Sequence, residues 1–406
     1  MTTPATEELG DAFFQDPQDV FARLRASGPA TPVVMPDGGR AWLVTRYADV
    51  RAALADPRLA KDWMTHMTPE DWNPDPSHTY FNRNMLNLDP PDHTRLRRLV
   101  TKAFTSRRVA ALRPRIATIT DELLDAMAAA GSAGSAGSSG AVDLLEVFAF
   151  PLPVTVICEL LGIPARDRDD FRVWSAAFVD SRVPREDFQS ASTAMYQYFT
   201  DLLAEKRRRP GDDLVSALIT AQDADDSLSD SELLSMLFLL LIAGHETTVN
   251  LIGNGTLALL QHPAGLARLR SDMSLLPSAV EELLRYANPL NHATERFTLT
   301  PVVIGGVEIP AREWVIVATS SANRDASRFE DPSSLDVGRD ATGHVAFGHG
   351  IHYCLGAPLA RLEGEIAIGS LLSRFPGLSL AVPESELRWR VSSLIHGLES
   401  LPVRLG

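Results

Sequence analysis

The sequence predicts a mainly α-helical protein with a small β-rich region. The strongest observation is a helical pattern that starts at a capping box, Ser229-Asp230-Ser231-Glu232, and runs without proline to His262. Shorter helical patterns occupy residues 144–161, 166–179 and 186–208, whereas strand signals are brief. Apolar residues make up 45% of the 406 residues, which is enough for a substantial core.

No obvious linker divides the chain into halves with separate signals, so we expect a single domain over residues 1–406. Residues 129–141 are nearly pure Ala, Gly and Ser. Such a composition buries little apolar surface and predicts a flexible surface linker between helices.

The charge balance excludes some partners. Lys and Arg number 38 against 52 Asp and Glu, a net charge of −14, which argues against nucleic acid or an anionic membrane as a main partner. The N-terminus lacks the pattern of a signal peptide, and the most apolar stretch, residues 233–243, is too short to span a bilayer. Two cysteines form no disulfide framework, which fits a reducing compartment, so we expect a cytoplasmic location, with Cys158 in the core. We also expect a monomer.

The first third of the chain predicts a small sheet and a lid. Thr31 to Met35 and Ala41 to Thr45 flank a turn at residues 36–39 and predict a hairpin. Residues 63–91 then form an irregular segment rich in proline, methionine and aromatic residues. Exposed disorder is one interpretation, but disordered segments are poor in aromatic residues, which favours a lid over an apolar pocket.

Residues 93–120 carry eight basic residues and no acidic one, a local reversal of the overall charge. Most such runs form a solvated helix face. A sharper interpretation divides the run: His93 and Arg97, at helical i,i+4 spacing, face inward and bind carboxylates, while the outward members form a basic patch. The candidates for the outward patch are Arg98, Lys102, Arg107, Arg108, Arg113 and Arg115.

The helical pattern breaks at residues 181–184 and then resumes, which predicts a second half of the lid around residues 172–200. The long helix that follows is apolar on every face of its first half, so it should be buried. It nevertheless contains Ala243-Gly244-His245-Glu246-Thr247-Thr248. These polar groups are either satisfied by local hydrogen bonds, or Gly244 opens space for a small ligand and Thr247 and Glu246 pass protons to it.

Glu282 and Arg285 stand at i,i+3 spacing on a further helical pattern, an ion pair that by itself is a weak signal. Strand signals follow at residues 295–300, 302–309 and 313–319, and residues 388–403 predict another hairpin with residues 393–396 at its tip.

Between these strands lies the run from Phe347 to Gly356, with three glycines in nine residues and helix-forming sequence directly after Cys354. A thiol at a helix N-terminus is favoured as thiolate, which suits an axial metal ligand. The alternative is that Cys354 is a small buried hydrophobic residue, the usual state of a lone intracellular cysteine.

The pattern Phe-Gly-x-Gly-x-His-x-Cys-x-Gly at residues 347–356 resembles the haem-binding loop of the cytochrome P450 family. Residues 243–248 are similar to the oxygen-activation motif of that family, and Glu282-x-x-Arg285 falls where the family has its Glu-x-x-Arg. The motifs occur in family order over essentially the whole chain. The resemblance implies a triangular helical body with a long central helix and a small β-rich region, with haem between that helix and the cysteine loop.

The resemblance also assigns roles to individual residues. It implies that Cys354 is the proximal iron ligand, and that Thr247 and Glu246 deliver protons. The other implied cofactor-binding residues are His93, Arg97, Ala243, Gly244, Arg296, Phe347, Gly348, His352 and Gly356, and the implied structural network is Glu282, Arg285 and Arg339. The expected substrate pocket contains Met85, Leu86, Val179, Ala293, Thr294, Leu394 and Ile395.

The resemblance therefore implies a monooxygenase that carries haem b, iron protoporphyrin IX. It would insert one oxygen atom from O2 into a hydrophobic small molecule by hydroxylation or epoxidation, with electrons from a ferredoxin and its reductase. The chain looks similar to actinobacterial enzymes that hydroxylate macrolides or secosteroids. Two alternatives stay open, a peroxygenase driven by hydrogen peroxide and a haem-binding sensor without turnover.

Overall fold

The computed structural model describes residues 5–36, 38–66, 81–132, 140–179, 182–223 and 226–406. The chain forms two compact units. The first unit comprises Met1–Leu59, Arg113–Leu152 and Thr247–Gly406, and the second comprises Ala60–Leu112 and Pro153–Glu246. Three elements cross the boundary in sequence: β4 (Leu59–Ala60), α8 (Pro151–Leu161) and α12 (Asp230–Gln261). The single-domain expectation stays a prediction.

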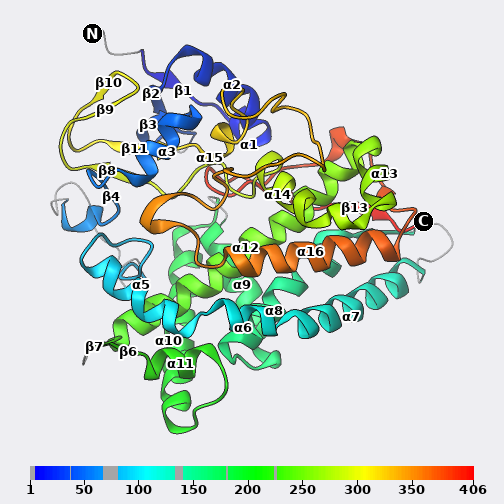
Figure 1. Ribbon diagram of the computed structural model, residues 1–406. Coiled ribbons are helices and arrows are strands. Elements are labelled where there is room, and N and C mark those ends of the chain that lie inside the picture. The colour runs from blue at the N-terminus through cyan, green and yellow to red at the C-terminus, as the bar shows by residue number, and fades with distance from the viewer. Residues whose placement is uncertain (1–4, 37, 67–80, 133–139, 180–181, 224–225) are drawn as a thin grey trace. The chain divides into compact units, whose positions relative to one another are not determined.

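The main sheet of the first unit joins strands from both ends of the chain (Figure 1). The predicted hairpin is present as β2 (Ala30–Val34) antiparallel to β3 (Arg40–Val44). β1 (Glu7–Glu8) runs parallel to β2, β11 (Trp314–Val317) runs parallel to β3, and β8 (Arg296–Thr298) is antiparallel to β11. Apolar side chains of β3 and β11 fill two clusters of the core. The sheet thus places Arg296 on β8 opposite Val315 of β11, one strand away from β3.

Two smaller sheets complete the β-rich region. β9 (Val302–Ile304) and β10 (Val307–Ile309) form a hairpin whose turn residues, Gly305 and Gly306, have φ angles of +57° and +90°. These left-handed values explain the glycine pair. β13 (Pro402–Arg404) pairs with both β12 (Ser379–Leu380) and β5 (Ala141–Asp143), a sheet that the sequence pattern did not predict.

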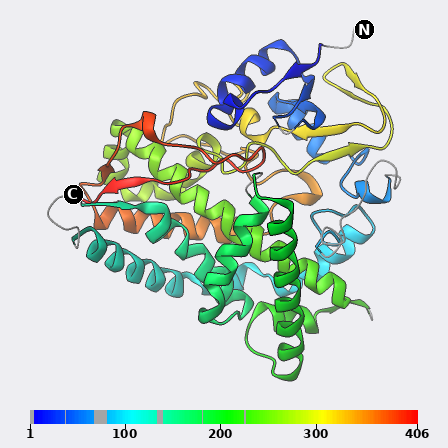
Figure 2. The ribbon, with the colours of Figure 1, turned by 180° about the vertical axis from the view of Figure 1, so that it is seen from behind.

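The helical part of the first unit surrounds α16 (Ala357–Arg374), which packs against α7 (Arg113–Ser132) and α14 (Leu276–Tyr286). Figures 1 and 2 show α16 and α7 side by side from both directions. The other helices of this unit are α1 (Ala12–Gln15), α2 (Pro17–Ser27), α3 (Tyr47–Ala55), α13 (Pro263–Ser271), α15 (Thr319–Ala322), a π-helix at Leu145–Ala149, and short 3-10 turns at Met273–Leu275, Gly350–His352 and Glu384–Glu386.

The second unit is built from helices. They are α5 (Asp92–Ala103), α6 (Ser106–Ala111), α9 (Arg168–Val179), α10 (Arg185–Arg208) and α11 (Leu214–Thr220), with 3-10 turns at Trp63–Thr65 and Ala165–Asp167 and a short pair of strands, β6 (Gln222–Asp223) and β7 (Asp226–Ser227). The buried ring of Phe171 on α9 stacks near Phe199 of α10 and meets Tyr198 edge to face, so aromatic contacts join these two helices.

The capping box of the long helix is confirmed. The Ser229 hydroxyl accepts the Glu232 N–H at 3.3 Å, and the Glu232 carboxylate accepts the Ser229 N–H at 2.8 Å. By length and composition α12 could cross a membrane, which corrects the expectation drawn from residues 233–243 alone. However, 61% of its apolar window is buried inside the protein, as in the core helix of a globular protein.

Parts of the lid and linker predictions, residues 67–80, 133–139 and 180–181, lie outside the described residues. The predicted break at residues 181–184 falls between α9, which ends at Val179, and α10, which begins at Arg185. The described end of the first lid segment is anchored in the second unit. The Phe81 ring stacks on Phe238 of α12 with centroids 4.2 Å apart and meets Phe178 of α9 at 6.3 Å. These rings form an apolar cluster, and the lid over an apolar pocket stays a prediction.

Candidate functional site

The loop before α16 presents the Cys354 thiol to solvent. Gly348 and Gly350 have φ angles of +73° and +80°, values that glycine adopts without strain. A Cβ atom on Gly350 would also approach the carbonyl oxygen of Leu54 to 3.0 Å. The Cys354 N–H donates to the carbonyl oxygen of Phe347 at 2.9 Å and closes the loop. The helix starts just after the thiol, as predicted, with Gly356 as its N-cap.

The Phe347 ring is held by side chains that the sequence reasoning did not single out. The Arg361 guanidinium lies over the ring, with Cζ 4.6 Å from the centroid. Arg361 donates to both carboxylate oxygens of Glu281, at 2.6 and 2.9 Å, and His344 contacts the same carboxylate at 3.1 Å. The only sequence signal for this cluster is the presence of two adjacent carboxylates, Glu281 and Glu282, on one helix.

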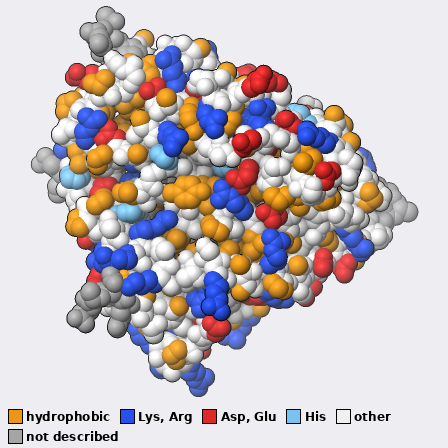
Figure 3. Space-filling model, in the orientation of Figure 1, with side chains coloured by type: hydrophobic (Ala, Val, Ile, Leu, Met, Phe, Trp, Pro, Cys, Tyr) orange, Lys and Arg blue, Asp and Glu red, His pale blue; other side chains and the backbone are white. Residues whose placement is uncertain are grey.

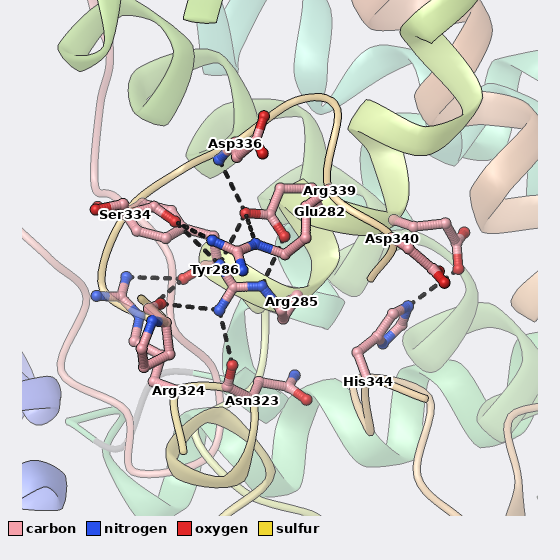
Figure 4. A network of polar contacts seen from close by, with 12 residues as sticks. Glu282, Arg285, Tyr286, Asn323, Arg324, Ser334, Asp336, Arg339, Asp340 and His344 are labelled. Atoms are coloured by element: carbon pink, nitrogen blue, oxygen red, sulfur yellow. Dashed lines mark hydrogen bonds and ion pairs between the residues drawn. The ribbon is translucent and has the colours of Figure 1, made fainter. Parts of the chain in front are cut away.

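The second of these carboxylates belongs to a buried network (Figure 4). Glu282 and Arg285 are both fully buried, and the Arg285 guanidinium donates to the two Glu282 oxygens at 2.6 and 2.8 Å. Arg339 donates to Glu282 at 3.1 Å. Arg285 also donates to the carbonyl oxygens of Asn323 and Pro332, each at 2.8 Å. The network therefore ties α14 to the segment that leads into the cysteine loop.

Other candidate residues of the first unit lie on its sheet and on the cysteine loop. Arg296 is 4% exposed and donates to the carbonyl oxygens of Leu54 and Leu59 at 3.2 and 3.3 Å. These bonds fix the guanidinium at the end of β8. His352 is half-buried in the 3-10 turn that precedes Cys354. Arg296 and His352 thus belong to the unit that carries the thiol.

In the second unit the predicted carboxylate-binding pair lies on α5, where His93 is 3% exposed and Arg97 is half-buried. Carboxylates of the second unit pair with some of the basic side chains of residues 93–120. Arg95 forms ion pairs with Asp226 and Glu232, and Arg108 pairs with Asp212 at 3.2 Å. In the first unit Arg113 pairs with Glu365 at 3.1 Å.

The polar cluster of α12 spans the boundary between the units. In the second unit His245 is buried, its Nδ1 bonds the carbonyl oxygen of Leu241 at 2.7 Å, and its Nε2 lies 3.5 Å from Glu246. Ala243 is exposed, while Gly244 packs on α8, because a Cβ there would lie 3.0 Å from Ile157. The structure thus gives Gly244 a packing reason, and the predicted opening for a ligand stays a prediction. Thr247, half-buried, begins the part of α12 that belongs to the first unit.

The structure brings together two of the predicted pocket segments. The Asn291 N–H donates to the Leu394 carbonyl oxygen at 2.9 Å, and Leu290 forms a β-bridge with Ile395. Residues 289–291 therefore lie against the tip of the C-terminal hairpin, while the Ala293 N–H donates to the Val317 carbonyl oxygen of β11 at 2.9 Å. In the second unit Met85 is buried and Leu86 is half-buried, while the side chain of Val179 lies outside the described part.

The donor set fits a metal porphyrin with two carboxylates. Within the described residues no cluster of three or more His, Cys, Asp and Glu side chains could hold a metal ion by itself. A single exposed thiol therefore suits a metal whose remaining ligands come from a macrocycle. The buried guanidinium of Arg296 supplies a charge that a carboxylate would neutralise.

Comparisons with known proteins agree with this fit. The Cytochrome P450 family model matches residues 171–388. Vitamin D(3) 25-hydroxylase of Pseudonocardia autotrophica is 50% identical, covering 100% of this chain and 98% of its own length. 6-deoxyerythronolide B hydroxylase of Saccharopolyspora erythraea is 46% identical, covering 100% and 99%. The solved structure of the tirandamycin C-bound P450 monooxygenase TamI matches with a TM-score of 0.89 at 51% identity, covering 98% of this chain and 100% of that one.

This chain therefore combines a solvent-exposed cysteine in a glycine-rich loop with a buried Glu-x-x-Arg pair, and it is matched by relatives over its whole length. The chain belongs to the cytochrome P450 family of haem-thiolate monooxygenases.

Proposed function

We propose that the protein binds haem b and inserts one atom of O2 into a hydrophobic natural product. The observation that carries the proposal is the exposed Cys354 thiol on a loop that its own backbone hydrogen bond closes. Cys354 would ligate the iron, and Gly348 and Gly356 would let the backbone approach the porphyrin. His93, Arg97, Arg296 and His352 would bind the propionates, and Phe347 would pack near the sulfur. Ala243, Gly244 and Thr247 would border the opposite side.

A thiolate-ligated haem, when bound, supplies the electron density that favours cleavage of the O–O bond. The overall reaction consumes the substrate, O2, two electrons and two protons, and yields the oxidised product and water. We assign the protons to Thr247 and Glu246. The imidazole of His245, 3.5 Å from the Glu246 carboxylate, supports the assignment as a polar neighbour of that buried acid.

The substrate class follows from the relatives. One acts on vitamin D(3), one on 6-deoxyerythronolide B, and a solved structure holds tirandamycin C. We propose a large, mainly apolar macrolide or steroid-like compound, with Ala293, Thr294, Leu394 and Ile395 among its contacts and with Met85, Leu86 and Val179 as further candidates. The hydrogen bonds between residues 289–291 and the hairpin tip support a preformed wall on this side.

The electron donor would be a ferredoxin, reduced by its reductase. Basic side chains gather over α5 and α6 in the view of Figure 3. Arg98, Lys102 and Arg107 are exposed there. We propose that the three exposed residues steer an acidic ferredoxin, because the net charge of −14 would otherwise repel it. A cytoplasmic location and a monomeric state complete the proposal.

A binding screen tests the substrate class. Purified holoprotein is titrated with macrolides, secosteroids and, as a size control, small aromatic alcohols, while the Soret band is followed for a spin-state shift. We expect saturable shifts with members of the first two classes, and hydroxylated or epoxidised product once NADH, ferredoxin and reductase are added. Product formation with hydrogen peroxide alone, at the rate of the full system, would instead favour the peroxygenase. Binding without product in either system would favour a sensor.

A further inference from the structure

The two adjacent carboxylates of α14 serve different neighbours. Glu282 belongs to the fully buried network with Arg285 and Arg339. Glu281 points instead toward α16 and the cysteine loop, where it meets Arg361 and His344. These residues come from three separate stretches of the chain, so their meeting is a product of the fold.

The contacts of Glu281 are specific in geometry. The Arg361 guanidinium presents Nε and Nη2 to the two carboxylate oxygens, the bidentate arrangement that fixes its orientation. Nδ1 of His344 accepts the Ala346 N–H at 3.2 Å, so the neutral ring carries its proton on Nε2 and donates it to Glu281 at 3.1 Å. Burial alone would raise the pKa of the Glu281 carboxyl, but the hydrogen bonds from His344 and Arg361 outweigh it and hold the pKa at about 2. The carboxylate is therefore charged at any physiological pH.

The fixed guanidinium in turn covers the Phe347 ring, 4.6 Å from its centroid. The rings of His344 and Tyr353 also lie near the Phe347 ring, with centroids 5.8 and 6.3 Å from its centroid. The backbone of Phe347 accepts the Cys354 N–H. Phe347 is thus held through its side chain by Arg361 and through its carbonyl oxygen by the cysteine itself.

We infer that Arg361, clamped by Glu281 and His344, is a positioning residue for the thiolate loop, and that it acts through Phe347 on cofactor retention and reduction potential. The inference rests on the proposed ligation by Cys354. A guanidinium on the thiolate side stabilises the reduced state, which carries one more negative charge, and the Glu281 carboxylate offsets part of this effect. Arg361 and Glu281 therefore have the same effect on the geometry of the loop and opposite effects on the reduction potential.

The opposite shifts in reduction potential distinguish a positioning role of Arg361 from a general contribution to stability. We expect Arg361→Met and Glu281→Gln both to speed haem transfer to an excess of a haem-scavenging apoprotein, by about tenfold, because each loosens the Phe347 ring. We expect Arg361→Met to lower the midpoint potential of the iron, measured by dye-linked reductive titration, and Glu281→Gln to raise it. Arg361→Lys, which keeps the charge without the planar fork, should restore the potential and only part of the retention.

The matched control is Arg374→Met, on the same helix, whose guanidinium pairs with Asp125 at 3.0 Å and belongs to an exposed pair. A double variant, Phe347→Leu with Arg361→Met, tests the route of the effect. Retention in Phe347→Leu should fall little further when Arg361 is also replaced, because the ring through which Arg361 acts is gone.

The inference is overturned if Arg361→Met keeps the retention and potential of the Arg374→Met control, or if both clamp variants shift the potential in the same direction. Full additivity in the double variant also overturns it. The reduced CO spectrum of the wild type shows whether a negative result concerns only the role of Arg361 or also the proposed ligation by Cys354. A thiolate-type Soret band with unaffected clamp variants removes only the inference, and absence of that band in the wild type removes the thiolate assignment and the inference with it.

Discussion

The backbone N–H of Cys354 donates a 2.9 Å hydrogen bond to the carbonyl oxygen of Phe347, so the thiol and the aromatic ring belong to one closed loop. Three features fix the loop. Its glycines turn the backbone, and α16 begins directly after it in the sequence. The carboxylates of Glu281 and Glu282 on α14 bind Arg361 and Arg339, which flank the loop in the sequence. These contacts fix the position of the thiol within the loop.

Replacing the ligand should abolish the chemistry. In Cys354→Ser a neutral hydroxyl donates far less electron density, so we expect loss of the thiolate-type Soret band in the reduced CO complex and loss of monooxygenation. The control is Cys158→Ser. Burial raises the pKa of the Cys158 thiol to about 12, so this cysteine stays protonated, and its variant should keep the spectrum at some cost in stability. An unchanged spectrum in Cys354→Ser would show that another residue ligates the iron.

Thr247→Ala should uncouple the enzyme. Haem content and substrate affinity should stay close to the wild type, because the hydroxyl handles protons rather than the substrate. NADH and O2 consumption should continue while a larger share of the electrons leaves as hydrogen peroxide, measured as product formed per NADH consumed. Thr256→Ala, a buried threonine further along α12, should leave this ratio unchanged. Full coupling in Thr247→Ala would contradict the proton assignment and point to the substrate as the proton donor.

Breaking the Glu282 network should be costly. Arg285→Met leaves a fully buried carboxylate with one cationic partner fewer, and we expect a loss of roughly 3–5 kcal/mol in the free energy of unfolding. Arg268→Met removes an arginine that pairs with Asp336 at 2.9 Å on the surface, and its loss should stay within about 1 kcal/mol. Urea titrations of both variants, followed by circular dichroism, measure the difference. Equal losses would mean that the buried pair does not anchor the loop segment.

Reversing the exposed charges of α5 should slow the first electron transfer. Arg98 and Lys102 stand at i,i+4 spacing on one face, and steering by such a patch changes association rates by about 10 to 10³-fold at low salt. We expect Arg98→Glu with Lys102→Glu to slow stopped-flow reduction by an acidic ferredoxin about tenfold, with a defect that shrinks as salt rises. Arg208→Glu with Arg209→Glu makes the same charge change at the end of α10 and should have little effect. A wild-type rate in the α5 variant at low salt would place the donor elsewhere.

Glu363 should make stability depend on pH. The side chain is buried on α16, its Oε2 has no hydrogen-bond partner within the described residues, and burial raises the pKa of the carboxyl to about 8. The folded state therefore keeps a proton that the unfolded chain releases near pH 4.5, so the free energy of unfolding falls as pH rises from about 4.5 to 8.

The variant Glu363→Gln cannot ionise at this position, so its free energy of unfolding lacks this dependence on pH. It should match the wild type at pH 5 and be more stable at pH 9, by an amount on the order of 2–5 kcal/mol. Thermal unfolding across this pH range measures it. Glu365→Gln, a half-buried carboxylate of the same helix that pairs with Arg113, serves as control and should track the wild type. Parallel curves for Glu363→Gln and wild type would show that the acid is ionised in the folded protein.

The sequence by itself determined the features that depend on short spacings. The capping box of α12, the β2 and β3 hairpin, the glycine pair between β9 and β10, and the glycines around Cys354 all act on neighbours a few residues away. Local patterns record such interactions directly, since helix caps and turns need particular residues at fixed offsets. The motifs at residues 243–248, 282–285 and 347–356, which resemble those of the cytochrome P450 family, are also short local patterns.

Only the tertiary structure decided which distant side chains meet. Glu281 reaches His344 and Arg361, 63 and 80 positions further along the chain, and no spacing rule connects these residues. Likewise, Arg108 belonged to a basic run in the sequence, but Asp212, 104 positions away, neutralises it in the fold. The sequence pattern also did not predict the third sheet, in which β13 pairs with β5 and β12. Pairings of this kind depend on the path of the backbone between the partners, which residue patterns do not record.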